Sequence, residues 1–177
     1  MKSCLIVAAP RSGSSNLMRS IAKGNNLKVC FEPFGSKKDP RDLKINGHCT
    51  KAISKRRTIE FWEKLSKKFD KVVLQARRDI KAQAESYVKL RLTKGPGNPD
   101  MKWIELNDHE KTFLPIGIEQ IEEAVFIIEE LSKRLNIPID YYEDIYTNYT
   151  LNDKSIKLDK SFLDPSRKCR VNKIYAI

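Results

Sequence analysis

A buried strand that runs directly into a glycine–serine turn and a helix is the feature that most constrains this chain. Residues 4–22 read CLIVAAPRSGSSNLMRSIA, and the apolar run of residues 4–9 is typical of a central parallel strand covered on both faces. Gly13 permits a tight turn that other residues resist. The segment therefore predicts a strand, a short polar loop and a helix over about 14–22, which the GNN of residues 24–26 ends.

Strands continue to alternate with helices along the rest of the chain. We predict strands at 27–31, 48–53, 71–76 and within 137–145, helices at 58–69, from about 79 and at 118–136, and loops at 35–47 and 93–115. This alternation predicts an α/β fold with a mainly parallel sheet flanked by helices. In such sheets ligands bind beyond the carboxyl ends of the strands.

Composition limits the classes of protein that remain. The 177 residues suit one domain over 1–177, and no apolar run is long enough to cross a bilayer. Four widely spaced cysteines without a CxxC pair favour reduced thiols and a cytoplasmic location. The formal net charge of +11 suits a polyanionic partner. We expect a small-molecule or carbohydrate substrate rather than nucleic acid, because no stacking platform or recognition motif is present; the oligomeric state stays open.

The loop after the first strand has the features of an anion site. Ser14, Ser15 and Asn16 open the helix, so their amide groups are predicted to be free and to face the loop, where the helix dipole also favours negative charge. Nucleotide triphosphatases carry a lysine after the second glycine of GxxxxGK[ST]. Here the basic residue, Arg11, precedes the glycine. We therefore expect the bound ligand to end in a group other than the terminal phosphate of a nucleoside triphosphate, and we expect no metal. The simpler alternative is a serine-rich helix start after an ordinary turn, with no ligand.

The same residues resemble the 5′-phosphosulfate loop of sulfotransferases that use 3′-phosphoadenosine 5′-phosphosulfate (PAPS). That loop is written Pro-(Arg/Lys)-Ser-Gly-(Ser/Thr)-(Ser/Thr), and residues 10–15 match it throughout. The resemblance implies a P-loop-like sulfotransferase fold, PAPS as the sulfuryl donor and adenosine 3′,5′-bisphosphate (PAP) as the product. It also implies a catalytic role for Arg11 and donor-binding roles for Arg11, Ser12, Gly13, Ser14, Ser15 and Asn16.

A second segment of the chain matches the family's 3′-phosphate site. That site consists of an arginine at the end of a later strand and a serine eight residues on. In LQARRDIKAQAESY, Arg78 follows the strand 71–76 and Ser86 lies eight residues further, while Arg77 is a competing candidate. An arginine offers a planar fork to a phosphate, and a serine two helical turns along can supply a hydroxyl. The amino-acid sequence of this segment is most similar to that of the bacterial trehalose-type and carbohydrate sulfotransferase branch.

The resemblance further implies a general base. In CFEPFG, Glu32 stands at the end of the second strand, which we expect to lie beside the loop of the first. A carboxylate there takes the proton of an acceptor hydroxyl; the alternative is a loop carboxylate paired with a neighbouring lysine. The YYEDI of residues 141–145 resembles a segment that closes the core of many sulfotransferases, and we expect its carboxylates to anchor nearby loops.

Two further segments lie outside the motifs described above. Residues 94–115 are expected to form a lid or acceptor loop, and 164–177 a basic tail in which Arg167 and Lys168 are similar to a late donor-binding loop of the family. Cys169 stands where that loop has glycine, so a solvated tail is the alternative. Two other functions stay open: a nucleotide or small-molecule kinase of the same broad fold, and a basic nucleic-acid-binding protein.

Overall fold

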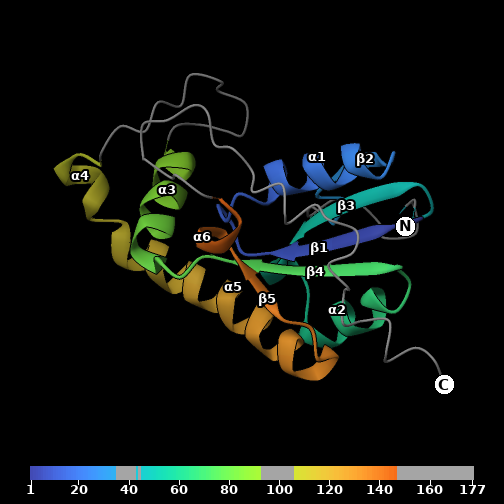
Figure 1. Ribbon diagram of the computed structural model, residues 1–177. Coiled ribbons are helices and arrows are strands. Elements are labelled where there is room, and N and C mark those ends of the chain that lie inside the picture. The colour runs from blue at the N-terminus through green and yellow to red at the C-terminus, as the bar shows by residue number, and fades with distance from the viewer. Residues whose placement is uncertain (35–42, 44, 93–105, 147–177) are drawn as a thin grey trace.

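The computed structural model describes residues 1–34, 43, 45–92 and 106–146 and contains a parallel sheet with helices on both faces (Figure 1). In chain order the elements are β1 Cys4–Ala8, α1 Ser14–Gly24, β2 Lys28–Phe31, β3 His48–Ile53, the 3-10 helix η2 Ser54–Arg56, α2 Ile59–Ser66, β4 Lys71–Ala76, α3 Ile80–Leu92, α4 Asp108–Lys111, α5 Leu114–Leu135, β5 Ile139–Tyr141 and α6 Tyr142–Ile145. The strand order is β2-β3-β1-β4-β5, and every pairing is parallel. The predicted α/β class is confirmed.

The central strand β1 is enclosed by a separate apolar layer on each face of the sheet. Leu5, Val7 and Ala9 lie in the cluster that the sheet shares with α2 and α5. Cys4, Ile6 and Ala8 lie in the cluster shared with α1 and α6. Burial on both faces explains why this strand reads as a continuous apolar run rather than an alternating one. It also fixes β1 between β3 and β4, so its carboxyl end opens at the middle of the sheet edge.

The segment predicted as the loop 93–115 is partly helical, and that part of the prediction is wrong. Residues 93–105 lie outside the described residues, but α4 follows directly, and α5 begins at Leu114, before the predicted 118. Asn107 caps α4 in a capping box with Glu110. Pro115 lies in the first turn of α5, where its missing N–H would have no helical partner in any case.

The helix α3 crosses the carboxyl end of the sheet because it is anchored to α5. Gly117 of α5 lies so close to α3 that a Cβ built there would be 2.6 Å from Cγ2 of Val88. Figure 1 shows α3, α4 and α6 gathered at the end of the sheet opposite the N-terminus. In the described part of the chain, no helix combines the length and the apolar character needed to cross a bilayer.

Candidate functional site

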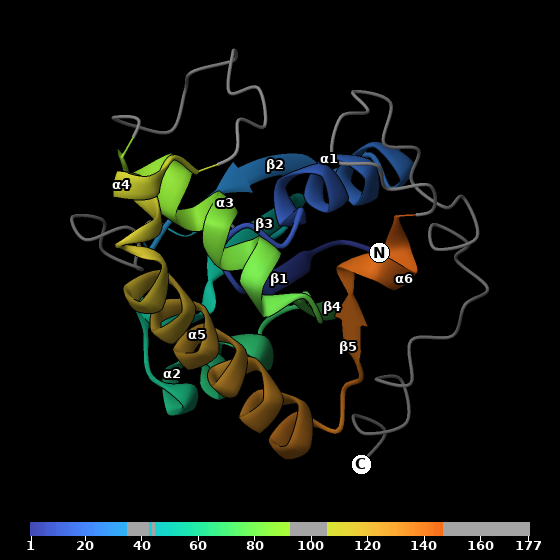
Figure 2. The same cartoon turned by 90° about the vertical axis from the view of Figure 1, so that its left-hand side faces the viewer.

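Three helical elements meet at the carboxyl edge of the sheet, where the sequence predicted a ligand. Figure 2 looks onto this edge and shows α3 lying across it, with α1 and α6 on the side of α3 away from α5. The loop of residues 9–13 leaves β1 at this edge and enters α1. The residues predicted from distant sequence segments therefore converge on one region of the molecule.

The loop after β1 has a strained backbone held by packing. Arg11 has φ 63° and Gly13 has φ 77°, both in the left-handed region. That region is ordinary for glycine but unusual for arginine. The Tyr146 hydroxyl donates to the carbonyl of Gly13 at 2.9 Å, and a Cβ at Gly13 would lie 2.6 Å from the Tyr142 ring. Burial raises the pKa of Tyr146, which keeps its phenol protonated as a donor.

The start of α1 leaves donors available to an anion. No acidic residue occupies its first turn, and Gly13, at the N-cap position, supplies no side-chain hydrogen bond. The expectation that the backbone amide of Asn16 is free is wrong, because it donates to the Gly13 carbonyl at 3.0 Å; the donor-binding role of its side chain stays a prediction. The amides of Ser14 and Ser15 have no acceptor among the described residues. The fully buried Ser12 hydroxyl also has no partner there.

The loop after β1 contacts the second predicted motif directly. Nε of Arg11 donates to Oγ of Ser86 at 2.8 Å, across 75 positions in the sequence. One turn earlier on α3, Nε2 of Gln83 donates to the carbonyl of Pro10 at 2.5 Å. Ser86 and Gln83 are both buried, so these contacts fix the loop against α3. The structure thus brings together Arg11 and Ser86, which the sequence placed in two separate motifs.

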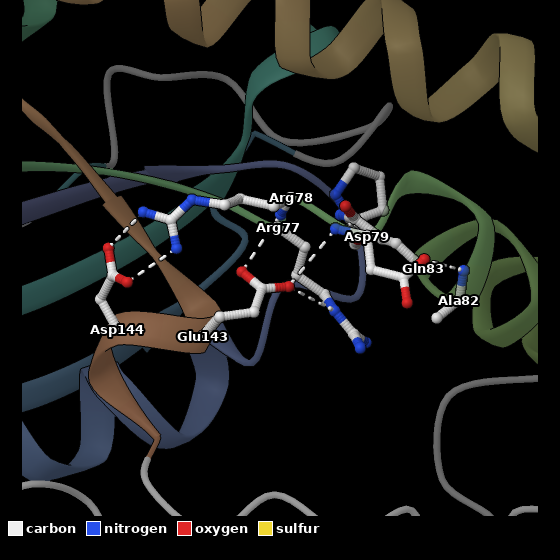
Figure 3. Close-up of polar contacts among 8 residues, drawn as sticks. Arg77, Arg78, Asp79, Ala82, Gln83, Glu143 and Asp144 are labelled. Carbon is white, nitrogen blue, oxygen red and sulfur yellow. Dashed lines mark hydrogen bonds and ion pairs between the residues drawn. The ribbon is translucent and has the colours of Figure 1, made fainter.

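The two candidate arginines after β4 point in different directions (Figure 3). Arg78 is 52% exposed and forms a bidentate pair with Asp144, at 2.7 and 2.6 Å. This hydrogen bonding raises the pKa of Arg78. Arg77 is 4% exposed, and its guanidinium carbon lies 4.7 Å from the centroid of Tyr142, the ring that also packs against Gly13. Arg77 is therefore the arginine on the side of the loop.

A carboxylate of the protein itself occupies the start of α3. Glu143 of α6 accepts hydrogen bonds from the backbone amides of Arg78, at 3.1 Å, and Asp79, at 3.4 Å. Its Oε1 also lies 3.7 Å from Nε of Arg77 (Figure 3). The carboxylates of the YYEDI segment do anchor a neighbouring loop, as expected. Glu143 does so at the position where the sequence predicted an external phosphate.

Glu32 lies at the same edge but not directly beside the loop of β1. The strand order places β3 between β2 and β1, which corrects the expected adjacency. Lys51 of β3 fills the gap, and its Nζ lies 2.5 Å from Oε1 of Glu32. The lysine is nearly buried and the carboxylate is 43% exposed. This pairing is the alternative that the sequence left open, and it places a lysine between the carboxylate and β1.

The backbone of Glu32 is also in a left-handed conformation, with φ 40°. Among the described residues other than glycine, only Arg11, Glu32 and two asparagines have positive φ. Asparagine tolerates this conformation, whereas arginine and glutamate rarely adopt it. Such strain persists where surrounding contacts impose it, and it is concentrated at functional sites. The two residues predicted to be catalytic are the two unusual members of this set.

Sequence reasoning missed Gln83 and the position of Glu143, and gave Lys51 no role. Gln83 stood in the matched segment, and a polar residue one turn before Ser86 was the available signal.

Arg167, Lys168 and residues 94–105 of the proposed lid lie outside the described residues. Within the described residues, no group of three or more His, Cys, Asp or Glu side chains could hold a metal ion. Comparison with known proteins finds no matching family model and no matching curated protein.

Proposed function

We propose that this protein is a sulfotransferase that moves a sulfuryl group from PAPS to the hydroxyl of a sugar or other small molecule. The observation that carries the proposal is the 2.8 Å hydrogen bond between Arg11 and Ser86. These residues come from the two segments that resemble the donor's 5′ and 3′ binding motifs. Their contact gives the two motifs one location at the carboxyl edge of a parallel sheet, where α/β folds bind nucleotides.

The loop residues would hold the 5′ end of the donor. The amides of Ser14 and Ser15 and the hydroxyl of Ser12 have no partner among the described residues and are the available donors. Arg11 would add positive charge where the bridging oxygen becomes an anion. Stabilising charge that develops in the transition state is a major part of catalysis. We also propose that the chain has the P-loop-like fold of the sulfotransferase family.

Ser86 and one arginine of the Arg77–Arg78 pair would hold the 3′-phosphate. The eight-residue spacing to Ser86 favours Arg78 as the phosphate ligand, but Arg78 would first have to break its ion pair with Asp144. Arg77 already lies on the loop side, next to Glu143. We infer that Arg77 is the nearer ligand and that Glu143 withdraws, or is displaced, when the phosphate binds. Either arginine offers the bidentate geometry that a phosphate favours.

Glu32 would act as the general base. It accepts the proton of the acceptor hydroxyl while that oxygen bonds to sulfur; the bond between sulfur and the bridging oxygen breaks, and its electron pair leaves with PAP. Lys51 pairs with Glu32 in the structure, and in the proposed reaction its ammonium group would face the transferring group once the pair separates. The thiols of Cys4, Cys30 and Cys49 are not in disulfides. Reduced thiols are typical of cytoplasmic proteins, and we propose that location for this protein.

The proposal is tested with radiolabelled PAPS and a panel of sugars, phenols and amines. The wild-type protein should transfer label to at least one acceptor. Glu32→Gln should bind PAP normally and lose transfer by about 10²-fold or more, the usual contribution of general-base catalysis. Glu123→Gln, at an exposed carboxylate of α5, is the matched control and should behave as wild type. Full activity in Glu32→Gln would show that the base is another residue.

The kinase is the alternative function, because ATP also binds at the carboxyl edge of such sheets. It is tested by thermal shift, in which a rise in melting temperature with ATP–Mg²⁺ and none with PAP would favour it. The position of Arg11 before Gly13 argues against it, since no lysine follows the glycine to reach terminal phosphates.

A further inference from the structure

Lys55, Tyr87 and Arg91 form a second positively charged feature next to the candidate donor site. Nζ of Lys55 donates to the Tyr87 hydroxyl at 3.2 Å and to Oε1 of Gln120, and it lies 5.0 Å from the centroid of the Tyr87 ring. Cζ of Arg91 lies 6.0 Å from the same centroid. Two cations therefore contact one aromatic ring, whose electron-rich face partly offsets their charge. We call this group the Lys55–Tyr87–Arg91 cluster.

The fold places this cluster on elements that follow the two strands beside β1. Lys55 belongs to η2, immediately after β3, and Tyr87 belongs to α3, which follows β4. Because β1 lies between β3 and β4, the contact between Lys55 and Tyr87 joins the two elements that follow the neighbours of β1. Tyr87 is also the residue after Ser86, which accepts the hydrogen bond from Arg11. Through Tyr87 the cluster therefore lies on the same helix as the contact between the loop and α3, one residue along.

The positive charge of the cluster is not neutralised by the described residues. Neither Lys55 nor Arg91 has a carboxylate within ion-pair distance there. Lys89, on the same helix, does pair with Glu110 at 2.7 Å, so α3 offers a direct contrast. Arg56 follows Lys55 in the sequence, is exposed, and also lacks a carboxylate partner in this part of the chain. Uncompensated cations beside a binding loop attract an anion.

We propose that the Lys55–Tyr87–Arg91 cluster binds an anionic group of the acceptor, so that the acceptor carries a carboxylate or phosphate besides the hydroxyl that is modified. The inference rests on the proposed function, because it assigns the donor to the neighbouring loop. The Tyr87 ring holds both cations in place, because Lys55 and Arg91 lie over it, and together the two cations supply the positive charge that attracts the anion. The cluster thereby selects an acidic acceptor over its neutral counterpart.

The test uses inorganic phosphate, glucuronate and glucose as probes of the protein saturated with PAP. Nuclear magnetic resonance reports the Arg91 Nε–H signal and the Tyr87 ring signals during each titration. Phosphate and glucuronate should shift both sets of signals, and glucose should bind at least tenfold more weakly than glucuronate. The double variant Lys55→Gln/Arg91→Gln, read at Tyr87, should weaken both anions at least tenfold and leave PAP affinity within twofold of wild type.

A matched control removes two charges elsewhere on the surface. Lys64→Gln/Lys68→Gln changes two exposed lysines near α2 and should bind the probes as wild type does, which separates a local site from the general effect of a +11 chain. The inference is overturned if the cluster signals do not move, if glucose moves them equally, or if the cluster variant loses PAP instead. Failure of the wild type to bind PAP would overturn the proposed function; the phosphate titration of the free protein then decides the cluster by itself.

Discussion

The junction between β1 and α1 and the junction between β4 and α3 lie on the same edge of the sheet but differ in how their charges are balanced. At the first, no acidic residue occupies the start of the helix, and Ser12, Ser14 and Ser15 keep donors without partners among the described residues. At the second, Glu143 accepts from the amides at the start of α3, and Asp144 pairs with Arg78. The first junction therefore keeps unpartnered donors among the described residues, whereas the donors of the second are bound by carboxylates of the protein.

If the protein binds PAPS as proposed, this difference predicts an order of binding. The donor's 5′ end would bind at the first junction without displacing a protein group, because the Ser12 hydroxyl and the amides of Ser14 and Ser15 have no partner among the described residues. A 3′-phosphate at the second junction would have to compete with Glu143 for Arg77 and for the amides of Arg78 and Asp79. The hydrogen bond from Arg11 to Ser86 links the two junctions, so binding at one changes the surroundings of the other.

The largest effect is expected from Arg11→Ala, which removes the cation of the first junction and its link to the second. A hydrogen bond from a charged group contributes about 1.5–3 kcal/mol, so PAP affinity should fall by about 10- to 150-fold in isothermal titration calorimetry. Arg19→Ala, on the exposed side of α1, is the control and should change affinity by less than about twofold. An affinity for PAP that is unchanged by Arg11→Ala would remove the first junction from the site.

The second effect distinguishes the two arginines of the β4–α3 junction. Arg77→Gln should weaken PAP binding about tenfold, which corresponds to about 1.4 kcal/mol, because Arg77 lies on the loop side. Arg78→Gln should have a smaller effect, since its guanidinium is held by Asp144. Calorimetry on this matched pair gives the order directly. A larger loss in Arg78→Gln would support the choice made from sequence spacing and show that Arg78 leaves Asp144 on binding.

A smaller effect is expected from Ser12→Ala at the first junction. The Ser12 hydroxyl is buried without a partner among the described residues, so its removal should not lower the melting temperature. If the hydroxyl binds the donor, PAP affinity should fall by about two- to tenfold, which is the range of a neutral hydrogen bond of about 0.5–1.5 kcal/mol. Loss of stability together with unchanged affinity would assign Ser12 a structural role instead.

The smallest effect is expected from Glu143→Gln, and it has the opposite sign. Removing the competing charge at the second junction should tighten PAP binding by up to about fivefold, because ion pairs near the surface contribute about 0.2–1 kcal/mol. Asp144→Asn is the matched control, since it removes a carboxylate from the same helix that pairs with Arg78 instead. Weaker PAP binding in Glu143→Gln would mean that this carboxylate positions Arg77 for the ligand rather than competing with it.

The sequence predicted the positions of the strands well, most clearly for β1 and β4, which are largely apolar runs with clear boundaries. The observed bounds of β3 and β4 coincide with the predicted 48–53 and 71–76. The helical turn of α4 was missed, because the Pro- and Gly-rich composition of residues 93–115 outweighed the capping box of Asn107 and Glu110. The early start of α5 was missed for a similar reason, since a proline such as Pro115 suits a loop as well as the first turn of a helix.

The candidate site was only partly predictable, because part of it depends on contacts between distant segments. The sequence motifs by themselves assigned Arg11 and Ser86 to one site, and the contact between the two side chains agrees with that. The pairing of Lys51 with Glu32 depends on β3 lying between β2 and β1, which local pattern does not determine. The carboxylate of Glu143 reaches α3 across 65 positions of sequence. The left-handed backbone of Arg11 and Glu32 opposes their intrinsic preference and has no local signal.

The most direct test of the central claim compares three nucleotides by isothermal titration calorimetry: PAP, adenosine 5′-monophosphate and adenosine 3′-monophosphate. If the two junctions hold opposite ends of one donor, PAP should bind at least about tenfold more tightly than either monophosphate, because each phosphate adds its own charged hydrogen bonds. Equal affinity for PAP and one monophosphate would show that only one junction binds nucleotide and would contradict the account.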